Sequence, residues 1–222
     1  MIKALLCDID GTLVDSNWLH AAAWKDAFAS EGIQVDLEEA RRQIGKGGDE
    51  LIPVFVPDEE QRKSIEERLK ERRKKIFEEK YLAQVKALPM AREFLQRLKE
   101  KGIALALASS SDKDGLKAYK KIVGMENLID EETTADDAER AKPHPDIFQV
   151  ALKKAGVEAA DALALGDTPY DAEAAGKAGV KTIGVTTGGW SERELLDAGC
   201  IEVYPNVADL LKSFDESALN RK

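Results

Sequence analysis

The segment IKALLCDIDGT, residues 2–12, is an apolar run that ends in two aspartates, a glycine and a threonine. The mostly apolar character of residues 2–9 predicts a strand there, because strands covered on both faces are apolar at successive positions. Gly11 then permits a sharp turn of the backbone. The alternation of a strand places Asp8 and Asp10 on the same side. The segment therefore predicts a buried first strand with two carboxylates at its carboxyl end.

Three later apolar segments predict further strands of the same kind. They are residues 103–108, 162–165 and 181–185, and a helical pattern precedes each of them. Repeated strand, turn and helix units form parallel sheets with helices on both faces, and ligands bind such sheets at the carboxyl ends of the strands. We therefore predict an α/β fold built on a doubly wound parallel sheet.

Residues 16–86 differ from the rest of the chain because their pattern is helical throughout, with turn signals near Gly32, residues 45–48 and residues 53–57. Residues 58–80 predict a long helix whose many charges solvate an exposed face. A chain of 222 residues is long for one domain and short for two. The predicted organisation is a core domain of residues 1–15 and 87–222 with a helical insertion of residues 16–86.

Composition limits the partners that the protein can have. The net charge is -9 and no basic stripe is present, which argues against nucleic acid and anionic membranes as partners. The sequence has neither a signal peptide pattern nor an apolar run of the roughly 18 residues that a membrane span needs. We expect a cytoplasmic protein, with a monomer as the default. Cys7 and Cys200 are predicted to be buried free thiols, although a disulfide pair stays open.

The paired aspartates after the first strand indicate chemistry. Two like charges held together are unfavourable without a cation, and an oxygen-rich site of this kind suits Mg²⁺. The alternative is an ordinary pair of loop carboxylates at a strand end, which Asp8 and Asp10 alone would favour. The following residues 11–15, Gly-Thr-Leu-Val-Asp, favour a functional site.

With Gly11 and Thr12, the two aspartates resemble D-x-D-G-T, the first motif of the haloacid dehalogenase (HAD) superfamily. The second HAD motif is a Ser or Thr that closes an apolar strand, and Ser109 fits it. Residues 109–111 could instead cap the next helix, with Ser111 and Asp114 as a capping pair. Ser110, beside Ser109, is a candidate for substrate binding.

Two further segments extend the resemblance across nearly the full chain. Lys142 begins KPHPDIF, which is similar to the family's K-P-x-P-D-x-F motif. Asp167 and Asp171 lie in GDTPYD, which resembles G-D-x-x-x-D. Thr168 is a candidate N-cap of the following helix, so that Asp171 is either its capping partner or a support for the metal site.

The resemblance implies a Rossmann-like HAD core with an inserted all-helical cap domain, and a Mg²⁺-dependent phosphatase of a small phosphorylated metabolite. Asp8 would be the nucleophile and Asp10 the general acid and base. Lys142 and Ser109 would stabilise the transferring phosphoryl group. Asp8, the carbonyl of Asp10, and Asp167 would bind Mg²⁺.

Substrate choice is expected to depend on residues of the helical insertion. His20 and Trp24 share one helix face, and Lys46 and Gly47 lie in a glycine-rich basic loop suited to an anionic substrate. Alternatively, His20 and Trp24 simply pack the first helix of the insertion. The spacing of Asp15, Ser16, His20 and Trp24 also resembles beta-phosphoglucomutases, so a sugar phosphate mutase is an alternative. Residues 184–196 look more like phosphatases similar to phosphoglycolate phosphatase, and a non-catalytic relative that binds a phosphometabolite is the third possibility.

Overall fold

The computed structural model describes residues 2–221 and divides the chain into two compact units. The first contains the chain up to Asp15 and from Lys86 onward, and we call it the core unit. The second is Ser16–Val85, which we call the helical unit. A short antiparallel pair, β2 (Val14–Asp15) and β3 (Lys86–Ala87), lies in the core unit where the chain leaves it and returns.

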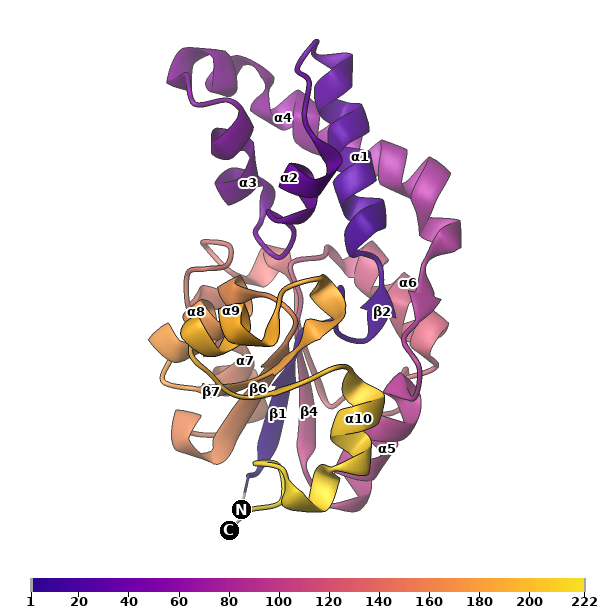
Figure 1. The fold of residues 1–222 in the computed structure, drawn as a ribbon, viewed down its shortest axis with the longest axis vertical. Helices are drawn as coiled ribbons and strands as arrows, with labels where there is room; N and C mark the ends of the chain where they lie inside the picture. The colour runs from indigo at the N-terminus through magenta and orange to yellow at the C-terminus, as the bar shows by residue number, and fades with distance from the viewer. Residues whose placement is uncertain (1, 222) are drawn as a thin grey trace. The chain divides into compact units, whose positions relative to one another are not determined.

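Six parallel strands form the sheet of the core unit (Figure 1). Their order is β5 (Glu131–Thr133), β4 (Ala104–Ala108), β1 (Ala4–Cys7), β6 (Ala162–Gly166), β7 (Lys181–Val185) and β8 (Cys200–Tyr204). The four strands predicted from apolar runs are the central four, and the predicted fold class is confirmed. The edge strands β5 and β8 escaped prediction because glutamates interrupt their apolar character. An edge strand is covered less completely and tolerates such residues.

Helices cover both faces of this sheet, as expected for parallel strands. Helices α5 (Ala91–Glu100) and α10 (Val207–Lys212) pack together on one face, and α7 (Asp146–Ala155) and α8 (Pro169–Lys177) lie on the other (Figure 1). The remaining helices of the unit are α6 (Lys113–Val123) and α9 (Glu192–Asp197). Alanines of β4 and β6 and Leu6 of β1 form a buried core with Phe148 of α7 and Ala174 of α8. This packing fixes the strand ends that carry the predicted motifs.

The helical unit contains α1 (Asn17–Ser30), α2 (Leu37–Arg41), α3 (Gly48–Phe55) and α4 (Glu59–Ile76), followed by a π-helical turn at Phe77–Tyr81. Helix α1 packs against α2 and α4. The predicted charged helix is α4, which buries only a narrow stripe that includes Ile65, Leu69 and Ile76. Its charged residues therefore belong mainly to its exposed face.

Two expectations from composition concern the whole chain. Among residues 2–221, no helix has the length and apolar character needed to cross a membrane. Cys7 and Cys200 are both buried and free, so the prediction of buried thiols is confirmed.

Candidate active site

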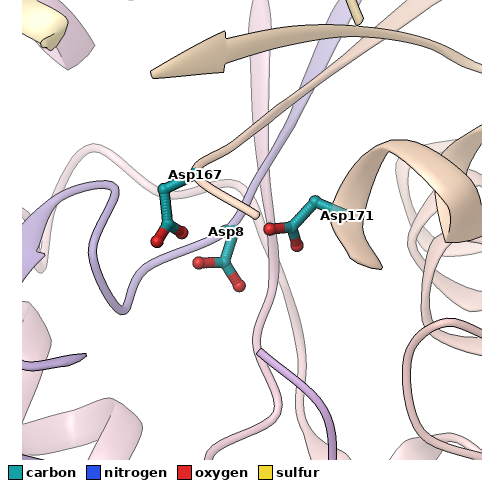
Figure 2. Close-up of side chains that lie close together, drawn as sticks. All are labelled: Asp8, Asp167 and Asp171. Carbon is teal, nitrogen blue, oxygen red and sulfur yellow. The ribbon is translucent and has the colours of Figure 1, made fainter. Parts of the chain in front are cut away.

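Three carboxylates converge at the carboxyl ends of the two central strands (Figure 2). Asp8 directly follows β1, Asp167 directly follows β6, and Asp171 lies in the first turn of α8. One oxygen of each lies within 4.8 Å of the others. Asp8 is 7% exposed and the other two are at most 1% exposed. The parallel pairing of β1 with β6 thus brings together residues that lie far apart in the sequence.

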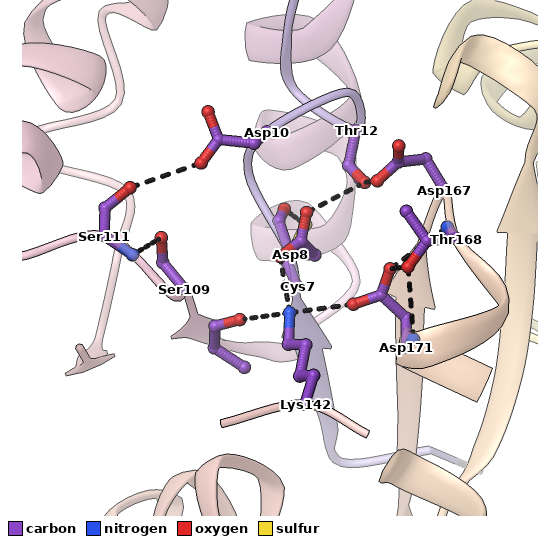
Figure 3. Close-up of polar contacts among 11 residues, drawn as sticks. Cys7, Asp8, Asp10, Thr12, Ser109, Ser111, Lys142, Asp167, Thr168 and Asp171 are labelled. Carbon is purple, nitrogen blue, oxygen red and sulfur yellow. Dashed lines mark hydrogen bonds and ion pairs between the residues drawn. The ribbon is translucent and has the colours of Figure 1, made fainter. Parts of the chain in front are cut away.

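A buried lysine lies between two of these carboxylates (Figure 3). The Nζ atom of Lys142 is 2.6 Å from Asp8 Oδ1 and 2.7 Å from Asp171 Oδ1, and it donates to the Ala108 carbonyl at 3.0 Å. The ring of Phe148 lies 5.4 Å from the ammonium. Burial by itself lowers the pKa of Lys142, but Asp171 and Asp8 outweigh that effect and raise it. Lys142 therefore stays charged and forms ion pairs with both carboxylates.

The same cluster carries an excess of negative charge. Burial raises the pKa of Asp8 to about 7; Lys142 opposes this shift, and the charges of Asp171 and Asp10 add to it. Lys142 alone cannot neutralise Asp8, Asp167 and Asp171. Closely spaced, buried carboxylate oxygens with uncompensated charge are a donor set that fits a hard divalent cation such as Mg²⁺.

Each oxygen of Asp171 has a polar or charged partner. Its Oδ2 accepts from the hydroxyl of Thr168 at 2.6 Å and from the Thr168 backbone N–H at 3.1 Å, which completes the capping box at the start of α8. Its Oδ1 faces Lys142. Asp171 therefore has the first of the two roles that the sequence left open, that of capping partner, and it is also a counterion of the lysine. Gly166 permits this arrangement, since a Cβ there would lie 2.5 Å from Asp171 Cβ.

Asp10 lies beside the segment that follows β4. Its Oδ2 accepts from Ser111 Oγ at 3.2 Å, and the backbone N–H of Ser111 donates to Ser109 Oγ at 3.1 Å (Figure 3). Ser109 is fully buried, and Ser110 is half-buried. The predicted capping pair of Ser111 and Asp114 is wrong. Asp112 caps α6 instead by accepting from the Gly115 N–H, which leaves the Ser111 hydroxyl to Asp10.

Sequence reasoning assigned no role to Thr12, although it quoted this residue as part of the first motif. Thr12 is fully buried. Its hydroxyl donates to Asp167 Oδ1 at 3.0 Å and lies 3.4 Å from Asp8 Oδ2. Thr12 thus links the two carboxylates that follow β1 and β6.

The candidates in the helical unit form a cluster of a different kind. His20 and Trp24 are buried on α1. The ring of His20 stacks on Phe77 with centroids 4.0 Å apart, and Arg73 Nη2 lies 2.6 Å from His20 Nδ1. The guanidinium of Arg73 also lies 5.6 Å from the Trp24 ring centroid and 5.4 Å from that of Phe77. Sequence reasoning missed Arg73 because it lies in the charged run of α4.

The other two candidates of the helical unit lie in the turn between α2 and α3. Lys46 Nζ donates to Gln43 Oε1 at 2.7 Å, and Gly47 is the residue that precedes α3. This turn supplies a basic side chain and a bare backbone next to the start of a helix. The structure thus places the four candidates in two groups, His20 with Trp24 and Lys46 with Gly47.

Comparison with known proteins identifies the family. The family model described as haloacid dehalogenase-like hydrolase matches residues 5–185, and the chain belongs to this family. A solved hydrolase from Pseudomonas syringae is 32% identical, with a TM-score of 0.89 over 97% of this chain and 99% of that one. The phosphorylated carbohydrates phosphatase of Thermotoga maritima is 29% identical over 205 residues, which are 90% of this chain and 93% of that protein.

A third relative was solved with a ligand. A variant of CbbY from Rhodobacter sphaeroides in complex with xylulose-1,5-bisphosphate is 26% identical, with a TM-score of 0.77 over 95% of this chain and 96% of that one. The family and its phosphatase members establish this protein as a HAD-family phosphoric monoester hydrolase. The predicted superfamily and enzyme class are confirmed.

Proposed function

We propose that the protein is a Mg²⁺-dependent phosphatase that hydrolyses a small phosphorylated sugar or similar metabolite through a phosphoryl group carried on Asp8. The observation that carries this proposal is the buried Asp8 carboxylate at the end of the central strand, paired with Lys142 at 2.6 Å. The names of the Thermotoga maritima relative and of the Rhodobacter sphaeroides complex support a phosphorylated carbohydrate as the substrate class.

Asp8 is suited to act as the nucleophile because its two oxygens have different surroundings. Oδ1 contacts Lys142, whereas Oδ2 lies on the side of Thr12. Attack of Oδ2 on phosphorus would form the Asp8–phosphorus bond and break the bond from phosphorus to the ester oxygen of the substrate. Water would then attack the same phosphorus and release inorganic phosphate, which regenerates Asp8.

Asp10 would move the protons of both steps. It would donate a proton to the leaving ester oxygen and then accept one from the attacking water, so that its protonation state is restored after each cycle. The hydrogen bond from Ser111 to Asp10 Oδ2 fixes the direction of this carboxyl group. Ser111 therefore supports the position of the proton donor.

Lys142 and Ser109 would stabilise the transferring phosphoryl group, with Ser110 as a further donor. Phosphoryl transfer needs mainly positioning and neutralisation of charge. Lys142 forms an ion pair with Asp171 Oδ1, and Asp171 Oδ2 accepts from Thr168. We therefore assign Asp171 to the lysine rather than to the metal.

Asp8, the carbonyl of Asp10, and Asp167 would hold Mg²⁺. When bound, the ion supplies positive charge that offsets the carboxylates and the phosphoryl oxygens. The raised pKa of Asp8 and the excess of carboxylates over Lys142 support a need for such a cation. Thr12 contributes by orienting the Asp167 carboxylate.

We assign substrate choice to the helical unit, Ser16–Val85. Arg73 presents a planar guanidinium beside His20, Trp24 and Phe77, and such a fork matches a phosphate or carboxylate group. Lys46 and Gly47 supply a second place for an anionic group. The sugar or acid portion of the substrate would be selected by these residues.

The test is phosphate release by the purified protein with Mg²⁺ from phosphoglycolate, hexose and pentulose phosphates, and nucleotides. Asp8→Asn should abolish release, whereas Asp197→Asn, an exposed carboxylate of α9, should not. Conversion of beta-glucose 1-phosphate to glucose 6-phosphate with little free phosphate would instead establish the mutase. Binding of these compounds without any turnover would establish a non-catalytic relative.

A further inference from the structure

The segment after β7 contributes to the site although no motif and no step of the mechanism uses it. It is a short helical turn, Thr186–Gly188, followed by Gly189 with a φ of 80°. Because β7 is the neighbour of β6, the carboxyl end of β7 is adjacent to Asp167.

Gly188 lies directly against the Asp167 carboxylate. A Cβ at this position would be 2.0 Å from Asp167 Oδ2, 2.8 Å from Asp167 Cγ and 2.7 Å from the Asp167 carbonyl oxygen. Packed interiors do not accommodate such overlaps without movement. The φ of Gly188 is outside the left-handed region, so its backbone conformation does not require glycine. The close approach to Asp167 is the reason for it.

Anchors on both sides hold this segment in place. Before Gly188, the hydroxyl of Thr187 donates to the carbonyl of Gly11, in the turn that follows Asp10. After Gly188, Trp190 and Tyr170 form a T-shaped ring contact with a centroid distance of 5.9 Å, and Trp190 packs in a buried cluster with Ala172 of α8. A side chain at position 188 would therefore displace Asp167 more readily than the segment.

Asp167 has a partner on its other side as well. Thr12 donates to Asp167 Oδ1 at 3.0 Å, while Gly188 lies against Oδ2. The carboxylate is fully buried between the two. Relief of the overlap with a Cβ would move Oδ2 by about 1 Å, and a misplacement of that size in an active site has large effects.

We propose that Gly188 is a positioning residue. Its backbone, which carries no side chain, packs against the Asp167 carboxylate and directs it toward Asp8. This contact thereby sets the affinity of the site for Mg²⁺. This inference rests on the proposed Mg²⁺ dependence. The segment after β7 is thus a functional part of the site because of where its backbone lies.

The experiment compares Gly188→Ala with Gly176→Ala, a control in α8 where a Cβ would meet no atom within 4 Å. Mg²⁺ binding is measured by titration calorimetry on the intact protein without substrate, together with the rise in Tm that Mg²⁺ produces. We expect Gly188→Ala to weaken Mg²⁺ binding about 10- to 100-fold, as loss of a ligand-orienting contact does, and Gly176→Ala to leave it unchanged.

The outcomes separate this inference from the proposed function. If the unaltered protein does not bind Mg²⁺, the proposed function fails. If it binds Mg²⁺ and Gly188→Ala binds equally well, the positioning role of Gly188 is overturned while the proposed function stands.

A second comparison covers the case in which Gly188→Ala folds poorly. The stability penalty of Gly188→Ala is measured by urea unfolding in the natural background and in Asp167→Ala, without Mg²⁺. The penalty should shrink in Asp167→Ala, because the contacts at 2.0 and 2.8 Å disappear while the one with the carbonyl oxygen remains. An equal penalty in both backgrounds would overturn the proposal.

Discussion

Lys142 of the core unit and Arg73 of the helical unit are both cations at the centre of a polar cluster, and their surroundings differ. Lys142 is 1% exposed and is held by two carboxylates and a carbonyl. Arg73 is half-buried and lies over two aromatic rings, beside the ring of His20. Ionic pairing fixes one geometry, whereas aromatic contacts tolerate adjustment. The fixed geometry around Lys142 suits a reaction step that is the same for every substrate. The adjustable geometry around Arg73 suits the substrate choice that we propose for the helical unit.

The largest expected effect comes from Lys142→Met. It should abolish activity and lower the free energy of unfolding by about 3–5 kcal/mol, because removal of one partner leaves buried charges without compensation. Urea unfolding measures the loss, and Lys212→Met, at a lysine whose side chain is 75% exposed, is the control. A Lys142→Met protein as stable as the control would contradict the account of the core cluster.

The charge of Asp8 should make the core sensitive to pH. Its pKa rises from an ordinary 3.8 to about 7 on folding, because burial favours the neutral form. The stability that this shift contributes is complete below pH 3.8 and is lost as the pH rises through about 7. The Mg²⁺-free protein should therefore gain stability from pH 8 to pH 6, and Asp8→Asn should reduce this gain.

Thermal denaturation at the two pH values measures this dependence, and Mg²⁺ provides its control. Because the ion offsets the same charges, it should raise Tm more at pH 8 than at pH 6. An identical pH dependence in the natural protein and in Asp8→Asn would show that another group is responsible.

Arg73→Met should have a smaller effect on stability. The lost cation–π contacts and the contact with His20 predict a cost of about 1 kcal/mol. If Arg73 contacts the part of the substrate that does not react, KM should rise more than kcat falls. Arg72→Met, at the exposed neighbouring position, is the matched control. A loss of kcat at unchanged KM would place Arg73 with the chemistry instead.

A change in reaction rate, with no change in activity or stability, is expected at the two buried thiols of the core unit. Burial raises the pKa of Cys200 to about 12, with a contribution from Asp171, and burial followed by the charge of Asp8 raises the pKa of Cys7. Since the thiolate is the reactive form, both should react with a disulfide reagent at pH 8 at least about 100-fold more slowly than in the urea-unfolded protein. Rapid reaction of one thiol in the folded protein would reveal a local opening of the core.

Much of the core could be predicted from the sequence because its signals are local. An apolar run precedes Asp8, and another precedes Asp167. Each run predicts a central strand, and the aspartate at its end is a candidate site residue. Thr168 and Asp171 likewise form the capping box that their spacing offered as one of two alternatives. Strand β5 could not be predicted, since its residues, Glu-Glu-Thr, carry no apolar run.

Other features depend on approaches between segments that no local pattern encodes. Asp112, and not Ser111, caps α6, and the hydroxyl of Ser111 donates to Asp10, which lies far away in the sequence. Gly188 is explained by a contact with Asp167, which lies on another strand end. Arg73 resembles its charged neighbours in α4 and is distinguished only by the aromatic rings that it contacts.

The central claim is that Asp8 carries the phosphoryl group during turnover. Its most direct test is to quench the enzyme with acid during turnover of its best substrate and to reduce it with borohydride, which converts an aspartyl phosphate to homoserine. The account predicts homoserine at position 8 by peptide mass spectrometry, dependent on substrate and Mg²⁺. Rapid phosphate release with an unmodified Asp8, or a modification at another aspartate, would contradict it.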